Sequence, residues 1–356
     1  MTRVAEAPAA LAGARRIRVP YTLVLTLLGL GVGAAATAAI AVGSVPLPPG
    51  DVWGILLHRL HPALAEPTWT AVRETIVLDV RLPRVLLCGV VGAGLSVCGM
   101  ALQALVRNPL ADPMLLGVSS GATVGAVLVL VLGVTLLGMF TLPVAAFCGA
   151  FLALVLVYFL ARSGGRMTTV RLVLSGVATA EVLSAIAGYL VITSGDPHKT
   201  ESAFRWMLGG LAGTTWDLVW IPASAVLLGT AVLLGVSRPL NLLLAGEEAA
   251  ASLGLNVHRF RATLFVVVAL MVGAVVAVSG AIGFVGLMMP HMVRLLVGAD
   301  HRRALPAVAL LGAGFLILTD LAARSLIAPE EIPIGILTAL AGGPFFLWLM
   351  RRRAAR

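Results

Sequence analysis

Long apolar runs separated by short polar segments dominate the sequence from end to end. The runs cover Tyr21–Val42 and, approximately, residues 82–106, 114–133, 138–161, 172–193, 217–236, 262–281, 285–297, 305–323 and 333–350. Most are close to the roughly 20 residues that a helix needs to cross a bilayer. The pattern predicts an all-α polytopic membrane protein with about ten transmembrane helices, in which residues 1–356 form one integral-membrane domain.

The polar segments between these runs predict the side of the membrane that each loop occupies. Residues 1–19 are expected to form a cytoplasmic N-terminal tail. Residues 44–80 are expected to form an external loop with a short interfacial helix near Val52–Leu60, and residues 194–217 a second external segment. If both termini lie inside, about eighteen of the 25 Lys and Arg residues fall on the inner side, as the positive-inside rule requires.

Composition supports the membrane assignment independently. The chain is 60% hydrophobic and only 12% charged, whereas about a quarter of a soluble protein is charged. The net charge of +9 does not indicate nucleic acid, because excess Arg is typical of cytoplasmic loops. Cys88, Cys98 and Cys148 all fall inside apolar runs, and an odd, buried set argues against disulfides or a metal cluster.

The sequence contains no recognisable catalytic residues. It has no H-E-x-x-H, G-x-S-x-G or C-x-x-C motif, and its single lysine, Lys199, is not preceded by a glycine-rich phosphate-binding loop. We therefore expect a transport subunit that is not itself an enzyme and that binds no cofactor or metal. If transport is active, ATP and magnesium must be bound by a separate ATPase subunit.

The stretch Arg81–Val124 carries the densest set of motifs. It begins with RLPR, continues through an apolar run rich in small residues, and reaches the polar turn RNPLADP before LGVSSGA opens a second apolar run. Asp112 followed by Pro113 is a typical helix start, because Asp accepts from free N–H groups and Pro tolerates the first helical position. Small residues repeat four positions apart, and this spacing lets helices approach closely in lipid.

This stretch resembles the signature of FecCD-type permease subunits of ABC importers for iron–siderophores, haem and cobalamin. Further matches are FVGL..PH within residues 280–294 and PIG at 333–335. The resemblance implies the type II importer permease fold in the bacterial cytoplasmic membrane. It also implies ABC ATPase subunits, a second permease subunit (identical or a sister chain) and an extracytoplasmic substrate-binding protein. A ferric siderophore is the expected cargo, with haem or cobalamin as alternatives.

A polar inner segment at 238–261 is the expected coupling loop. Glu247 and Glu248 favour a helix N-terminus, and Gly254 suits a helix C-cap, so a short helix followed by a second one near Asn256 would form a compact knob. The segment resembles the EAA–G loop that docks in a cleft of the ATPase subunit in bacterial importers. That resemblance assigns coupling to Glu247, Glu248, Ala249, Ala250 and Gly254. The alternative is a solvated loop with ordinary helix caps.

Three arginines, Arg81, Arg84 and Arg324, oppose the inside bias because they lie at the outer ends of predicted spans. They could be snorkelling anchors, or partners in an Asp79–Arg81 or Asp320–Arg324 pair. The resemblance implies instead that they receive acidic residues of the binding protein, for which the planar guanidinium fork is suited.

Four residues are candidates for the translocation pathway: Glu181, Met100, Gly283 and Gly286. Glu181 could face a polar pathway or bond to Ser184 or Thr179. Met100 is a candidate lining residue or core filler, and the two glycines permit a broken helix beside a cavity. A rival class is a proton-coupled secondary transporter that uses Glu181. An intramembrane enzyme would need a cluster of acids, histidines or cysteines that the sequence lacks.

Overall fold

The computed structural model describes residues 20–354 except 44, 164–165 and 168. The tail predicted at 1–19 lies outside the described residues. The first half contains α1 (Tyr21–Ala41), α2 (Pro49–Leu60), η1 (Pro62–Leu64), α3 (Ala71–Thr75), the π-helical η2 (Ile76–Arg81), α4 (Leu82–Val106), η3 (Pro113–Leu116), α5 (Val118–Leu132), η4 (Gly138–Phe140) and α6 (Thr141–Ala161).

A short antiparallel hairpin of two strands, β1 (Arg162–Ser163) and β2 (Arg166–Met167), precedes the second half. The remaining helices are α7 (Thr169–Ile192), α8 (Pro197–Met207), α9 (Trp216–Gly235), α10 (Ser237–Ala245), α11 (Glu247–Ser252), α12 (Val257–Ser279), α13 (Val285–Val297), α14 (His301–Ser325) and α15 (Ile334–Ala354). Among the described residues, eight helical segments are long and apolar enough to cross a membrane, and two shorter apolar helices, α5 and α13, accompany them. The all-α polytopic fold predicted from the sequence is confirmed.

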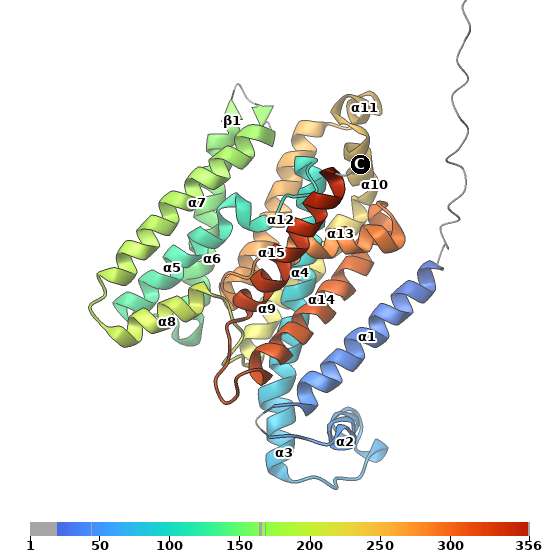
Figure 1. The fold of residues 1–356 in the computed structure, drawn as a ribbon, viewed down its shortest axis with the longest axis vertical. Helices are drawn as coiled ribbons and strands as arrows, with labels where there is room; N and C mark the ends of the chain where they lie inside the picture. Colours follow the sequence, from blue (N-terminus) through green and yellow to red (C-terminus); the bar gives the residue numbers. More distant parts are fainter. Residues whose placement is uncertain (1–19, 44, 164–165, 168, 355–356) are drawn as a thin grey trace, which may run out of the picture.

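Helix α4 is the centre of the bundle (Figure 1). The most apolar part of its span is 78% buried, against 22% for α1 and α7. Helices α1 and α14 lie to one side of α4, and α5, α6, α7 and α8 form a group on the other. Helices α10 and α11 lie at one end of the molecule, called here the knob end, and α2 and α3 lie at the opposite end, called the far end.

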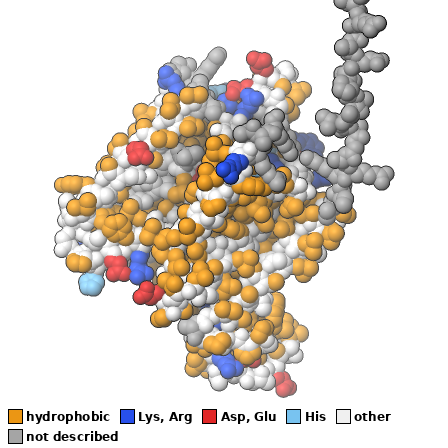
Figure 2. Space-filling model, viewed as in Figure 1, with side chains coloured by type: hydrophobic (Ala, Val, Ile, Leu, Met, Phe, Trp, Pro, Cys, Tyr) orange, Lys and Arg blue, Asp and Glu red, His pale blue; other side chains and the backbone are white. Residues whose placement is uncertain are grey.

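The surface follows the same axis. Hydrophobic side chains cover most of the middle of the face in Figure 2, and charged side chains gather mainly towards the two ends. Because lipid is as apolar as these side chains, burial alone does not hold such helices together, and close backbone contact or polar bonds must do so. Glycines allow the close backbone contact. A Cβ on Gly92 of α4 would lie 2.2 Å from the Gly312 carbonyl oxygen of α14, so only glycine fits at this position.

Three boundaries differ from the sequence prediction. The predicted external loop ends early, because a continuous helix runs from Ala71 through the π-helical turn into α4. The segment 194–217 contains α8, which Asp196 caps by accepting from the His198 N–H. Asn256 does cap a helix, but that helix is the long α12 and not a short one, so the predicted second short helix is wrong. The short helix beside α11 is α10, which precedes it in the chain.

Candidate functional site

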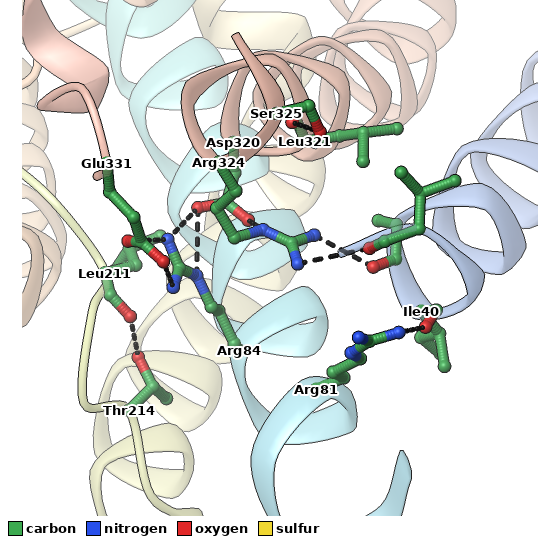
Figure 3. A network of polar contacts seen from close by, with 12 residues as sticks. Ile40, Arg81, Arg84, Leu211, Thr214, Asp320, Leu321, Arg324, Ser325 and Glu331 are labelled. Atoms are coloured by element: carbon green, nitrogen blue, oxygen red, sulfur yellow. Dashed lines mark hydrogen bonds and ion pairs between the residues drawn. The ribbon is translucent and has the colours of Figure 1, made fainter. Parts of the chain in front are cut away.

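An arginine–carboxylate network joins α1, α4, α14 and the loop before α15 near the far end (Figure 3). Arg84 donates from Nε and Nη2 to Asp320 Oδ1 at 3.0 and 2.8 Å, and from both Nη atoms to the two oxygens of Glu331. Arg324 donates from Nε to the other oxygen of Asp320 at 3.0 Å. Asp320 is fully buried, so two guanidinium groups, and not water, are the partners of its carboxyl group.

Two arginines, Arg81 and Arg324 of the network, close the end of α1. The last carbonyl groups of a helix have no partner within the helix, and a positive charge there also favours the helix dipole. Arg81 donates to the carbonyl oxygens of Ile40 and Ala41, and Arg324 donates to that of Ala39 at 2.8 Å. The buried Arg81 side chain is therefore a structural clamp on α1.

The network bears on the predicted docking role. The Asp320–Arg324 pair, one of the two alternatives to docking, is present. Arg81 is only 7% exposed and its guanidinium faces the end of α1, which argues against direct contact with another protein. Arg84 forms one wall of a cavity of about 560 Å³ together with Glu331 and Trp206. Docking stays a prediction for Arg84 and Arg324.

At the knob end, α10, α11 and Gly254 form a projecting unit, called here the knob. Glu247 and Glu248 occupy the first turn of α11, as predicted. Gly254 has φ +85° and ends α11 in a Schellman arrangement: its N–H reaches the Ala251 carbonyl, and the Leu255 N–H reaches that of Ala250. Gly246, between the two helices, has φ +118°, so both corners of the knob use glycine.

Two side-chain bridges fasten the knob to the bundle. Arg261, 6% exposed at the start of α12, pairs with Glu247 at 2.8 Å and donates to the carbonyl of Leu105 at the end of α4. Asn241 of α10 donates to Asp300 at 2.7 Å and accepts from the His301 N–H at the start of α14. The Asn241 hydrogen bond, aided by the Arg302 N–H, lowers the pKa of Asp300. These contacts connect the knob to α4 and α14.

The predicted broken span is present. Backbone after α12 runs through Gly280 (φ +65°) to Phe284, whose φ of +68° is rare for a side-chain-bearing residue. Gly286 packs against Pro113 and against the Leu95 carbonyl of α4, and Gln103 donates to the Gly286 carbonyl at 3.2 Å. These contacts show dense packing around the break in place of an open cavity.

The turn between α4 and α5 carries a buried carboxylate beside this break. Asp112 accepts from the Met114 N–H at 2.8 Å through one oxygen, whereas its other oxygen is buried without a partner among the described residues. Burial raises the pKa of Asp112 to about 6. The sequence predicted that Asp112 caps a helix, but it did not predict that one of its oxygens is buried without a hydrogen-bond partner among the described residues.

The four pathway candidates do not converge on one site. Met100 is buried in α4, and Gly283 would place a Cβ 2.8 Å from the sulfur of Met114. Glu181 lies exposed on α7, and Ser184, suggested as its partner, instead bonds to Ser120. Cys148 is also exposed, so the expectation of a fully buried cysteine set is wrong for it.

Glu331, Gln103 and Arg261 are important residues that the sequence prediction missed, and Asp320 was considered only as a partner of Arg324. Asp320 lies within the predicted span 305–323, and the rule that singled out Glu181, an acid inside a span, applies equally to it. The sequence therefore shows both acids within apolar runs, but it does not show which of them faces the protein interior. Arg261 gave no signal, because it lies among other basic residues of a polar segment.

Comparison with known proteins fits this geometry. A model of the FecCD transport family matches residues 25–352, nearly the whole chain. The chain belongs to the FecCD transport family. It is a multi-pass membrane permease of ABC importers of this family, as expected from the Arg81–Val124 motifs.

Relatives of the chain differ in the cargo that they are named for. It is 45% identical over 307 residues to the cobalamin import permease BtuC of Halobacterium salinarum, covering 85% of this chain and 81% of that protein. It is 44% identical over 282 residues to the hemin transport permease HmuU of Yersinia pestis, covering 78% and 84%. A solved ABC transporter in an inward-facing conformation, of a type named for metal chelates, matches with a TM-score of 0.81 and 34% identity, covering 93% of this chain and all of that one.

Proposed function

We propose that this permease imports a metal chelate across the bacterial cytoplasmic membrane, with the knob end and both termini in the cytoplasm. An ABC ATPase subunit docks on the knob, a second permease subunit completes the pathway, and an extracytoplasmic binding protein delivers the cargo at the far end. The ATPase binds ATP and magnesium, and this chain contributes no catalytic group.

The observation that carries this proposal is the fastening of the knob. A docked ATPase can do work on the membrane helices only if its docking site is tied to them. Arg261 provides that tie, because one buried guanidinium bonds both to Glu247 in α11 and to the end of α4. Asn241 provides a second tie from α10 to the start of α14. The helices joined in this way, α4 and α14, also meet through the close Gly92–Gly312 contact.

Proteoliposomes holding the chain with its ATPase and binding protein test the coupling. Arg261→Gln is expected to keep ATP hydrolysis and to lower uptake per ATP by about tenfold or more, because the loss of a charge-assisted bridge costs about 1.5–3 kcal/mol. Arg302→Gln, an exposed arginine at the same end, is the control and should leave the ratio unchanged. Full uptake per ATP in the Arg261→Gln complex would contradict the coupling role.

Cysteine labelling tests the orientation. Ser252, exposed at the end of α11, replaced by Cys should react with an impermeant thiol reagent only from the cytoplasmic side. Cys148 must first be replaced by Ser, because it is exposed. Reaction from the outside would reverse the proposed topology and remove the knob as an ATPase site.

Arg84 is the residue best placed to receive the binding protein. Its inner partner, Asp320, is buried, whereas its outer partner, Glu331, has a 37% exposed side chain on a loop. A carboxylate from the binding protein could replace Glu331 without disturbing Asp320. Glu331→Gln should therefore tighten binding of the binding protein several-fold, and Arg84→Gln should weaken it. If neither variant alters binding in titrations, docking does not use Arg84.

The cargo is the finer part of the proposal. Support for cobalamin and for haem comes from the names of the two relatives above, at nearly equal identity. We place cobalamin first, because its relative matches more of this chain; haem is the second candidate, and the ferric siderophore expected from the sequence has less support. Competition among cyanocobalamin, haemin and a ferric siderophore in the same uptake assay distinguishes the three. Inhibition by the siderophore alone would reverse this ranking.

Replacement of Glu181, which is exposed on α7, tests the alternative that the chain is a proton-coupled secondary transporter. A proton-coupled secondary transporter would keep its uptake without any ATPase and would lose it in Glu181→Gln. An ABC permease shows the opposite on both counts.

A further inference from the structure

An apolar groove runs between α6 and α12 on the side of the molecule away from α14. Its volume is about 650 Å³, and none of the described residues that line it is acidic or basic. On α6 the lining includes Phe151, Val155 and Tyr158, and on α12 it includes Thr263, Val266 and Leu270. Each set follows helical spacing, so each forms one stripe along its helix.

Each stripe ends in an arginine. Arg162 directly follows the last residue of α6 and its guanidinium lies over the Tyr158 ring, whereas Arg259 precedes Thr263 by one turn on the same face of α12. The two helices are antiparallel: Tyr158 stacks near Phe265 at a centroid distance of 6.0 Å, whereas Phe147, earlier in α6, meets Gly273, later in α12. Arg162 and Arg259 therefore both lie at the knob end of the groove.

Both guanidinium groups are placed to bind an anion. Arg162 lies over the Tyr158 ring at 5.4 Å, a stacking that occupies the face of the guanidinium and leaves its N–H edges available. Among the described residues, neither Arg162 nor Arg259 forms an ion pair, and both are exposed.

The dimensions of the groove match one lipid leaflet. From Phe151 to Ala161, the last residue of α6, the helix rises roughly 15 Å, about half of the hydrocarbon thickness of a bilayer. An acyl chain lying along the stripes would thus place its phosphate at the level of the two arginines. Basic residues at the cytoplasmic edge of such a groove are suited to anionic headgroups.

We propose that the α6–α12 groove binds an anionic glycerophospholipid of the inner leaflet, with an acyl chain between the two stripes and the phosphate between Arg162 and Arg259. The inner-leaflet assignment rests on the proposed orientation. The binding itself does not, so its test is separate from the transport assay. An occupant of this kind would fill the space between the α5–α8 group and α12.

Native mass spectrometry of the full chain tests the site. After delipidation, the protein is titrated with phosphatidylglycerol or phosphatidylcholine carrying identical acyl chains. We expect selective retention of phosphatidylglycerol, and about 30-fold weaker retention in the Arg162→Gln/Arg259→Gln double variant. The Arg162→Lys/Arg259→Lys double variant should keep the selectivity, because a lysine also binds phosphate. Arg302→Gln, a basic residue on α14, is the matched control and should bind as the parent does.

A second variant addresses the acyl chain. Thr263→Trp places a large ring in the groove and should remove retention of both lipids; the arginine variants test the site even if this one folds poorly. Equal retention of the two lipids by the parent, or unchanged retention in the double Gln variant, would overturn the proposal. A change of oligomeric state in Thr263→Trp with phosphatidylglycerol retention intact would also overturn it, because the groove would then be a protein interface.

Discussion

The two sides of the bundle are held together by different forces. Helices α4 and α14 are joined by buried ion pairs around Asp320 and by close glycine contacts, and Arg81 and Arg324 bond to the last carbonyl groups of α1. In the α5–α8 group, no ion pair between helices is present among the described residues. There, backbones touch directly: a Cβ on Gly125 of α5 would lie 2.1 Å from the Ala145 carbonyl of α6. Neutral hydrogen bonds such as Ser120–Ser184 add to this contact.

The difference suggests that the two sides move differently during transport. A buried charge pair fixes register, because each carboxylate must meet its own arginine, whereas smooth backbone contact tolerates sliding of one helix along another. The knob is fastened to the α4 and α14 side through Arg261 and Asn241. We therefore expect the side with ion pairs to move as a unit and the α5–α8 group to shift relative to it.

The largest effect is expected at Asp320. Asp320→Asn leaves Arg84 and Arg324 with one carboxylate fewer in a buried place, and breaking such a network costs about 3–5 kcal/mol. Equilibrium unfolding in mixed micelles measures it. Removing a surplus charge at the same time, in Asp320→Asn/Arg324→Gln, should recover part of the loss. Asp51→Asn, which breaks the more exposed pair with Arg73, is the control and should cost far less. A cost below about 1 kcal/mol for Asp320→Asn would show that the network does not hold this side together.

Asp112, at the junction of the two sides, should give a pH-dependent effect. Burial raises its folded pKa to about 6, so its contribution to stability is fully present below the unfolded pKa and is lost as the pH rises through 6. The free energy of unfolding of the parent, relative to Asp112→Asn, should therefore fall by about 2.4 kcal/mol between pH 4 and pH 7.

The same comparison with Asp300→Asn is the control. The pKa of Asp300 is lowered, so its stabilising contribution persists at neutral pH and is lost only on acidification below the ordinary range of Asp. A flat difference between pH 4 and pH 7 for Asp112→Asn would contradict the assigned shift.

On the α5–α8 side, Gly125→Ala tests the backbone contact. The added methyl group would meet the Ala145 carbonyl, which is helix backbone and cannot move alone, so a cost of about 1–3 kcal/mol is expected. Gly188→Ala in α7 has no atom within 4 Å of the new Cβ and should be neutral or slightly stabilising. If the two variants unfold alike, close α5–α6 packing is not what holds this group.

The sequence predicted the helices of both sides but few of the bonds between them. The length of the apolar runs located ten spans, and the Gly254 corner and the Asp112 cap followed from local chemistry, which acts within a few residues. The Arg84–Asp320 pair joins residues 236 positions apart, so no local pattern can report it. Burial likewise depends on tertiary packing: it separates Asp320, fully buried, from Glu181, exposed, although both are acids within apolar runs.

The smallest effect should come from the one ion pair that the α5–α8 group contains among the described residues. Arg205 and Glu201 lie four residues apart on α8 at 2.9 Å, and both side chains are more than half exposed. An exposed pair of this kind contributes about 0.3–0.5 kcal/mol and is screened by salt. Arg205→Gln should therefore lower the free energy of unfolding by no more than that, and the difference should vanish at 1 M salt. A cost approaching that of Asp320→Asn would mean that charge pairs hold both sides, and the contrast between them would be lost.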